Sequence, residues 1–289
     1  MSHVLSKRRS ADPERPSAIH DAALEKAILA FRMRRPDEAE RLARAVLAAN
    51  RGSLAAAQIL GQALLLQNRP GEAIEPLRRA ARRSHDPATE TLLGRALAAV
   101  GRVDEALVQL RRTTARRPPF PLAFLELGEQ LGGLGRFDEA VTTFEGGMAL
   151  APDAAVLEVG LGYLHLKRND RHGARRLFAQ AHEAWPQRND ALIGLATVTA
   201  LDGDYAAAAD LYRRALGLRP DDAMTRIGLG KCLLEMGERD TGEAALRAAT
   251  LGAPQLAGLA ITALAATPRG RFFLRPSAVA SFLGVAASA

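Results

Sequence analysis

Six histidines and one cysteine are the side chains of this sequence best suited to metal or nucleophilic chemistry. They are His3, His20, His85, His165, His172, His182 and Cys232. His172 and His182 are accompanied by no Cys or carboxylate at the spacing of a metal site. No nucleophile elbow, phosphate-binding loop or pair of catalytic carboxylates is present. The sequence therefore predicts a protein that is not an enzyme and has no catalytic residue, cofactor or bound metal.

Arginines form the main charged pattern. Residues 1–120 contain 22 Lys and Arg against 13 Asp and Glu, whereas residues 121–289 contain 17 against 19. Two groups occupy similar positions in successive segments, with Arg116 one place later than its counterpart. The first group is Arg78, Arg79, Arg82 and Arg83, and the second is Arg111, Arg112, Arg116 and Arg117. Stacked helices would turn them into a basic stripe. The stripe suits an acidic protein partner, a nucleic acid or an anionic membrane surface. The alternative is that these arginines form an ordinary solvated surface. Nucleic acid is disfavoured, because no aromatic residues that could stack on bases accompany the arginines.

Small residues recur at a nearly constant interval and indicate which elements carry these side chains. The steps are 33 or 34 residues along Ala39, Ala73, Ala106, Ala140, Ala174, Ala208 and Gly242. Prolines repeat every 34 residues at Pro118, Pro152, Pro186, Pro220 and Pro254. A period near 34 is typical of stacked helical hairpins, each of which contacts its neighbours.

Two further series carry a resemblance to a known family. A Leu-Gly pair recurs at Leu60-Gly61, Leu93-Gly94, Leu127-Gly128, Leu161-Gly162 and Leu229-Gly230, with Leu195-Ala196 as the exception. A bulky residue follows at Leu77, Leu110, Phe144, Phe178, Tyr212 and Leu246. These positions resemble the tetratricopeptide repeat. The resemblance implies an all-α fold, a right-handed superhelical α-solenoid of stacked hairpins, and a scaffold or adaptor for protein–protein interaction. The family's early aromatic residue survives only as Phe124, and Glu90 and Glu158 are among its replacements.

The repeats divide the chain into three parts. Residues 1–19 are expected to form a disordered basic tail, because they lack periodicity. Seven repeats follow at 20–53, 54–86, 87–120, 121–154, 155–188, 189–222 and 223–256. Residues 257–289 are expected to form C-terminal capping helices and a tail. A segment with three arginines and two phenylalanines, 267–276, either caps the array or binds a partner or membrane.

The resemblance also implies where a partner would bind. In similar proteins, ligands lie along a concave groove lined by the first helix of each hairpin. The groove positions here are Phe31, Gln58, Gln62, Arg95, Leu125, Glu129, Val159, Tyr163, Ile193, Thr197, Ile227 and Lys231. The family's set of basic residues that grips a terminal carboxylate is missing. A mostly apolar groove suits an amphipathic helix or an extended segment of a partner.

These observations predict a peptide-binding or protein-binding scaffold, with an electrostatic tether through the arginine stripe as the alternative. The partner is expected to be acidic or amphipathic. One cysteine, no signal peptide and no apolar stretch of about 18 residues favour a cytoplasmic protein without a transmembrane segment. The Arg-rich and Ala-rich composition favours a bacterial source. The oligomeric state is left open.

Overall fold

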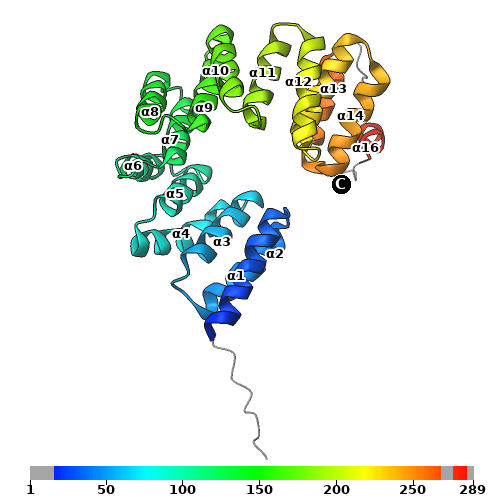
Figure 1. The fold of residues 1–289 in the computed structure, drawn as a ribbon. Helices are drawn as coiled ribbons and strands as arrows, with labels where there is room; N and C mark the ends of the chain where they lie inside the picture. The colour runs from blue at the N-terminus through cyan, green and yellow to red at the C-terminus, as the bar shows by residue number, and fades with distance from the viewer. Residues whose placement is uncertain (1–15, 268–275, 285–289) are drawn as a thin grey trace, which may run out of the picture. The chain divides into compact units, whose positions relative to one another are not determined.

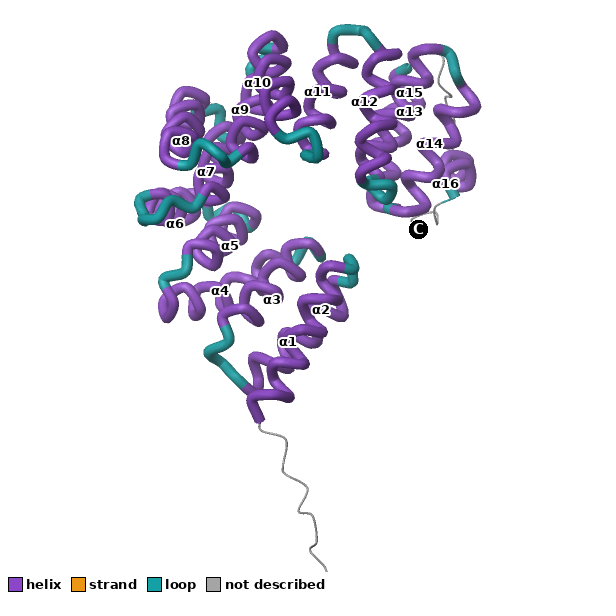
Figure 2. The backbone as a smooth tube through the Cα atoms, in the orientation of Figure 1, coloured by secondary structure: helices purple, strands orange, loops and turns teal. Residues whose placement is uncertain are grey.

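The structure, a computed structural model, describes residues 16–267 and 276–284, and these residues form helices and connecting loops without a strand (Figures 1 and 2). The helices are α1 (Pro16–Arg32), α2 (Pro36–Ala49), α3 (Leu54–Leu66), α4 (Pro70–Ser84), α5 (Pro87–Ala99), α6 (Val103–Thr114), α7 (Pro121–Gly133), α8 (Phe137–Leu150), α9 (Ala155–Lys167), α10 (Arg171–Ala184), α11 (Asn189–Leu201), α12 (Tyr205–Leu218), α13 (Ala223–Met236), α14 (Arg239–Gly252), α15 (Ala257–Ala266) and α16 (Pro276–Leu283). A short 3-10 turn, Pro254–Leu256, precedes α15.

The two ends differ in part from expectation. The first helix begins at Pro16, so residues 16–19 belong to α1 and not to the tail. Proline suits the first position of a helix, because the backbone N–H that it lacks would have no intrahelical partner at that position. The rest of the tail, 1–15, and residues 268–275 of the Arg/Phe segment lie outside the described residues.

Prolines and aspartates set the starts of many helices. Proline occupies one of the first two positions of α2, α4 and α5. The side chains of Asp170, Asp204 and Asp222 accept a hydrogen bond from a backbone N–H in the first turn of α10, α12 and α13. These oxygens satisfy N–H groups that the helix itself cannot.

Within each hairpin, the turn contains one residue in the left-handed region. Its φ values run from 55° to 87° at Arg34, Asn68, Gly101, Gly135, Asn169, Gly203 and Gly237. Glycine adopts this conformation without steric cost, and asparagine tolerates it better than most residues. These seven residues, here called the turn column, recur once per hairpin and let the second helix return along the first.

The Leu-Gly glycines receive the bulky residue of the following helix. A Cβ added at Gly61 would lie 2.8 Å from Leu77, and one at Gly94 would lie 2.6 Å from Leu110. The two series noticed in the sequence are therefore two sides of one contact, which closes each of these hairpins.

The chain divides into two compact units, residues 1–130 and 131–289. In the first unit, the main core joins α2 to α6 around fully buried Leu64 and Leu77. In the second, α15 and α16 pack on the last hairpin, and Leu264 and Leu283 are buried in a core with Leu234 and Leu246. The Thr250 hydroxyl also donates to the Leu283 carbonyl at 3.0 Å, which ties α16 to α14.

Candidate functional site

The second unit contains an apolar cavity of about 520 Å³ on the side of the first helices, here called the α13 cavity. Helices α9, α11 and α13 each contribute to its wall, and α12 and α15 complete it. The lining residues are Tyr163, Ile193, Thr197, Tyr212, Asp222, Met224, Thr225, Ile227, Gly228, Lys231, Leu259, Thr262, Ala263 and Ala266. Five of the expected groove residues, Tyr163, Ile193, Thr197, Ile227 and Lys231, are thus brought together here.

Aromatic packing holds one wall of the α13 cavity. The ring of Tyr163 meets that of Phe178 edge-on, with centroids 5.0 Å apart and an interplanar angle of 67°. Such T-shaped pairs are a favoured arrangement of aromatic rings. Tyr163 is nevertheless 37% exposed. Burial, with the nearby Tyr212, Asp190 and Asp222, raises the pKa of Tyr163 to about 12, so its phenol is neutral at physiological pH.

A hydroxyl chain joins two helices behind this wall. Thr197 donates to the Ile193 carbonyl at 2.8 Å. Its oxygen then remains to accept from the Tyr212 hydroxyl, which lies 3.1 Å away. Burial raises the pKa of Tyr212 as well, and this hydroxyl also stays protonated. The α11–α12 side of the α13 cavity is therefore preorganised and uncharged.

The polar groups of the α13 cavity differ in how far they are satisfied. Asp222 accepts from the backbone N–H of Thr225 at 3.2 Å and caps α13. Thr225 is 1% exposed, and its hydroxyl oxygen has no hydrogen-bond partner in the described part of the protein. A buried polar group without a partner costs free energy. The Thr225 hydroxyl is therefore an unsatisfied, buried polar group behind the lining of the α13 cavity, and Lys231 lies exposed in the same lining.

The first unit has a smaller cavity of about 330 Å³, the α5 cavity, between α3, α5 and α7. It brings together four other expected groove residues, Gln62, Arg95, Leu125 and Glu129. Its wall also includes Glu126, which is 9% exposed. Burial raises the pKa of Glu126, although a hydrogen bond from Gln130 at 2.9 Å and the charge of Arg95 act against that shift.

The three remaining expected groove residues line neither of these two cavities and make contacts with neighbouring residues of the array instead. Val159 is 5% exposed and belongs to a core cluster with Phe178, because its position on α9 turns toward the hairpin interior. Gln58 donates to Asp86 at 2.8 Å and to Thr89 at 3.0 Å, and so links α3 to the start of α5. Phe31 packs against the cluster of Ala30, Ala39 and Ala63.

Sequence reasoning missed the contribution of α15 to the α13 cavity. Leu259, Thr262, Ala263 and Ala266 line it, although α15 lies outside the repeats. Leu259, a large apolar residue on the capping helix, is 46% exposed. Its apolar character was the one sequence signal that α15 could contribute to a binding surface. Tyr212, one of the bulky residues of the repeat, was not among the expected groove residues, yet it also lines the cavity.

Carboxylates interrupt the expected arginine stripe. Arg78 lies 2.8 Å from Glu75 and 3.7 Å from Glu105. Arg112 lies 4.0 Å from the carboxylate of Glu90. Arg117 donates to the carbonyls of Thr114 and Arg116. Arg82 and Arg111 are exposed, and Arg79 and Arg83 line a separate cavity. Carboxylates of α4, α5 and α6, those of Glu75, Glu90 and Glu105, therefore lie among these arginines.

His165 and Cys232 have structural surroundings. His165 Nδ1 lies 2.7 Å from an oxygen of Asp170. Cys232 is buried, and burial raises the pKa of its thiol to about 11. Within the described residues, no group of three or more His, Cys, Asp or Glu could hold a metal ion.

The paired helices, the turn column and the glycine contacts together define an all-α repeat solenoid. Models of the tetratricopeptide repeat match residues 91–155 and 159–223, and a second such model matches residues 200–266. These matches extend over more than half of the chain, and the protein belongs to the tetratricopeptide-repeat family. Residues 33–113 also match the model of subunit 3 of the anaphase-promoting complex, or cyclosome.

Solved structures show the same fold. A tetratricopeptide repeat protein from Parabacteroides merdae aligns with a TM-score of 0.59 and 14% identity, over 92% of this chain and 97% of that chain. The APC/C hetero-tetramer Cut9-Hcn1 aligns with a TM-score of 0.59 and 17% identity, over 94% of this chain and 56% of that chain. The present chain thus spans about half of that relative. A comparison with curated protein sequences finds no match.

Tetratricopeptide repeats generally serve as scaffolds for protein interaction, and their fold is typically not catalytic. In the described part of the chain, no helix has the length and apolar character needed to span a membrane.

Proposed function

We propose that this protein is a non-catalytic scaffold that binds a segment of a partner protein, and that an apolar side chain of this segment enters the α13 cavity. The observation that carries the proposal is the combination of an apolar wall with one buried, unsatisfied hydroxyl, that of Thr225. Ligand sites are commonly apolar hollows with a few placed polar groups.

The exposed side chains of the α13 cavity favour an apolar anchor. Met224 is 54% exposed and Leu259 is 46% exposed, although both are large and hydrophobic. Together with Tyr163 they form an exposed apolar patch. Burial of this patch by a partner would contribute a favourable free energy of about 25 cal/mol per Å² of apolar surface. Methionine adapts to differently shaped side chains, which suits a site that accepts a peptide.

The polar residues of the cavity fit a peptide segment better than a wholly apolar ligand. A small shift of the cavity wall would let the buried Thr225 hydroxyl donate a hydrogen bond to a peptide carbonyl or accept one from an N–H. Asp222 at the start of α13 and Lys231 further along the same helix offer charges of opposite sign in the lining. An amphipathic helix or an extended segment with one apolar anchor satisfies all three groups.

A blocking substitution tests the proposal. Thr262 is exposed, lines the α13 cavity and donates to the Gly258 carbonyl at 2.9 Å. Thr142 on α8 is a matched control, because it is also exposed and donates to the Asp138 carbonyl at 2.9 Å. Peptides are selected from a displayed random library on the wild-type protein, and their affinities are measured for Thr262→Trp and Thr142→Trp.

We expect the selected peptides to carry a Leu, Phe or Trp anchor and to lose affinity about tenfold or more with Thr262→Trp. Thr142→Trp should bind them as the wild type does. Peptides that bind both variants equally would place the binding surface elsewhere. Circular dichroism checks that both variants keep their helices.

A further inference from the structure

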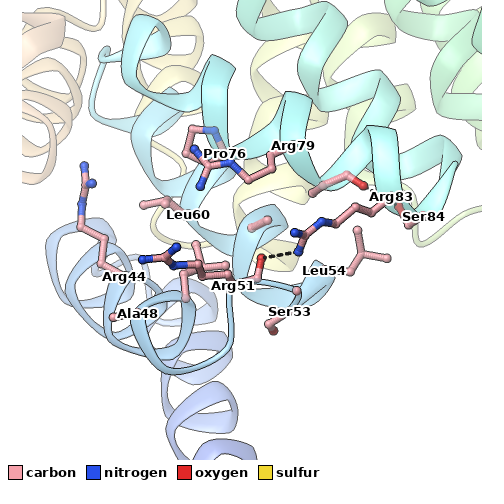
Figure 3. A pocket seen from close by; sticks show the side chains of 14 residues that line it. Arg44, Ala48, Arg51, Ser53, Leu54, Leu60, Pro76, Arg79, Arg83 and Ser84 are labelled. Atoms are coloured by element: carbon pink, nitrogen blue, oxygen red, sulfur yellow. Dashed lines mark hydrogen bonds between the residues drawn. The ribbon is translucent and has the colours of Figure 1, made fainter.

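A third cavity, of about 300 Å³, lies on the second-helix side of the first two hairpins and is here called the arginine cavity. Figure 3 shows the side chains of Arg44, Arg51, Arg79 and Arg83 around it, with Leu54 and Leu60 among the apolar residues between them. None of its 14 lining residues is acidic or aromatic. The groove of the proposed function does not include it.

The next pair of hairpins contains an equivalent cavity, which serves as an internal comparison. The sequence step from Leu60 to Leu93 is 33 residues, and both leucines line their respective cavities. Other lining residues correspond by the same repeat: Arg44 to Arg78, Arg51 to His85, Pro76 to Gln109, and Arg79 to Arg112. By this step, the counterpart of Arg83 is Arg116, which corrects the pairing expected from the sequence.

The two cavities differ in their acidic residues, because Glu90, Asp104 and Glu105 line the equivalent cavity and none lines the arginine cavity. Ala57 lines the arginine cavity, whereas its counterpart in the next cavity is Glu90. Glu90 is 1% exposed, and Arg116 donates to its two oxygens at 2.7 and 2.6 Å. The Thr113 hydroxyl lies 3.2 Å from the same carboxylate, and Arg112 lies 4.0 Å away. The equivalent cavity in the next pair of hairpins therefore holds a carboxylate of its own, that of Glu90, between two arginines.

The arginine cavity contains the corresponding arginines but no carboxylate equivalent to that of Glu90. Arg44 pairs with Glu40 at 2.8 Å and with Glu72 at 3.0 Å. Arg79 has no carboxylate within ion-pair distance among the described residues. Arg83 donates only to the Arg51 carbonyl, at 3.4 Å (Figure 3). Neighbouring cations without an acid repel one another, and an incoming anion relieves this repulsion.

We propose that the arginine cavity binds a Glu or Asp side chain of a partner protein, seated between Arg79 and Arg83 as Glu90 is seated between Arg112 and Arg116. Arginine binds carboxylates in a bidentate manner with defined geometry. Leu47, Leu54 and Leu60 in the same lining supply an apolar floor for a neighbouring side chain of the partner. The recognised chemistry is thus a short segment in which acidic and apolar residues adjoin.

The absence of aromatic residues from the lining argues against single-stranded nucleic acid, which binds by stacking its bases on rings. A phosphate group or an anionic membrane surface is the remaining competitor, because arginine also binds phosphate. The apolar floor favours the peptide over free phosphate, since phosphate offers it no apolar surface.

The test uses an acetylated and amidated peptide of alternating Glu and Leu, labelled for fluorescence anisotropy, with a Gln-Leu peptide as its uncharged control. Arg79→Gln/Arg83→Gln removes the proposed ligands. Ala57→Glu supplies the missing carboxylate from within the chain. Arg82→Gln is the matched control, because Arg82 lies on the same helix but lines the neighbouring cavity and not this one.

We expect the Glu-Leu peptide to bind the wild type at least tenfold more tightly than the Gln-Leu peptide. Arg79→Gln/Arg83→Gln and Ala57→Glu should each reduce the affinity tenfold or more, and Arg82→Gln should leave it unchanged. Thr262→Trp should also leave it unchanged, so that failure here is distinguishable from failure of the α13 cavity. Should Ala57→Glu not fold, the arginine variant decides alone.

Three outcomes would overturn the proposal. Equal losses in Arg79→Gln/Arg83→Gln and Arg82→Gln would indicate unspecific attraction by positive charge. A folded Ala57→Glu protein with unchanged affinity would show that the carboxylate does not enter beside these arginines. Binding of inorganic phosphate or of phosphatidylglycerol vesicles through Arg79 and Arg83, without binding of the peptide, would assign the site to another anion.

Discussion

The ring of Phe178 lies against Gly162, where an added Cβ would be 2.7 Å from the nearest ring carbon. The same ring carbons also approach Gly194 of the next hairpin, where a Cβ would be 2.4 Å away. One aromatic residue of α10 therefore fills the space beside α9 and beside α11 at two positions without side chains. The contact couples neighbouring hairpins as well as closing its own.

This contact predicts opposite effects for two glycine substitutions. Gly162→Ala should destabilise the protein by about 1–3 kcal/mol, because Phe178 must shift within a packed core. Gly146→Ala on α8 should stabilise it by roughly 0.5–1 kcal/mol, because a Cβ there meets nothing within 4 Å and alanine favours the helix. Urea denaturation of both variants checks the signs. Equal effects would mean that Phe178 adapts freely.

The Glu90–Arg116 pair should behave as a coupled buried unit. Arg116→Met should cost about 3–5 kcal/mol, because it leaves the buried Glu90 carboxylate without its bidentate partner. Glu90→Ala/Arg116→Met should recover most of this loss, since no buried charge then remains unpaired. A double-mutant cycle by denaturation measures the coupling. Additive effects of the two changes would show that the pair is energetically unimportant.

Glu158 predicts a pH dependence of stability. Burial raises its pKa above the ordinary value of 4.5, and its Oε2 atom has no hydrogen-bond partner in the described residues. A raised carboxyl pKa means that the folded protein binds the proton more tightly than the unfolded chain. The resulting stabilisation is fully present below the unfolded pKa and is lost as the pH rises through the folded pKa.

Glu158→Gln should therefore raise the melting temperature at pH 7, where the wild type carries a poorly solvated charge. The gain should disappear as the pH is lowered below 4.5, where the wild-type side chain is also neutral. Glu145→Gln, at an exposed position of α8, should change little at either pH. A gain for Glu158→Gln that is the same at both pH values would point to a cause other than titration.

Tyr163 should contribute to partner binding through its apolar ring more than through its hydroxyl. Tyr163→Ala should weaken the peptides selected for the α13 cavity by roughly 1.5–3 kcal/mol, because it removes apolar contact area. Tyr163→Phe should retain most of the affinity. Isothermal titration calorimetry compares the two, and a larger loss for Tyr163→Phe would mean that the hydroxyl carries the recognition.

The fold was predictable because its signals are local and periodic. The Leu-Gly pairs and bulky residues such as Leu110 and Phe178 predicted the all-α repeat solenoid, and the structure and the family comparisons confirm it. The contacts between these two series then follow from helical geometry, since each pair lies 16 or 17 residues apart within one hairpin.

The candidate sites were less predictable because they depend on contacts between hairpins. The charge of Arg78 is offset by Glu105, which lies on the next hairpin, and sequence spacing alone does not show that these side chains meet. Glu90 looked only like a lost aromatic residue until Arg116 was found beside it. Helix α15 has no counterpart in the repeat, and no periodic argument could place Leu259 in the α13 cavity.

The turn column has a consequence for how the array frays. Arg34 alone in that column is neither glycine nor asparagine, and it holds φ at 55°. A left-handed conformation costs a residue with a Cβ roughly 1–2 kcal/mol. The first hairpin should therefore open more readily than the hairpins whose turn residue is glycine or asparagine. Because Arg44 and Arg51 belong to that hairpin, unfolding of α1 and α2 would dismantle the arginine cavity while leaving the α13 cavity intact. The two proposed binding sites would then be lost one at a time on warming.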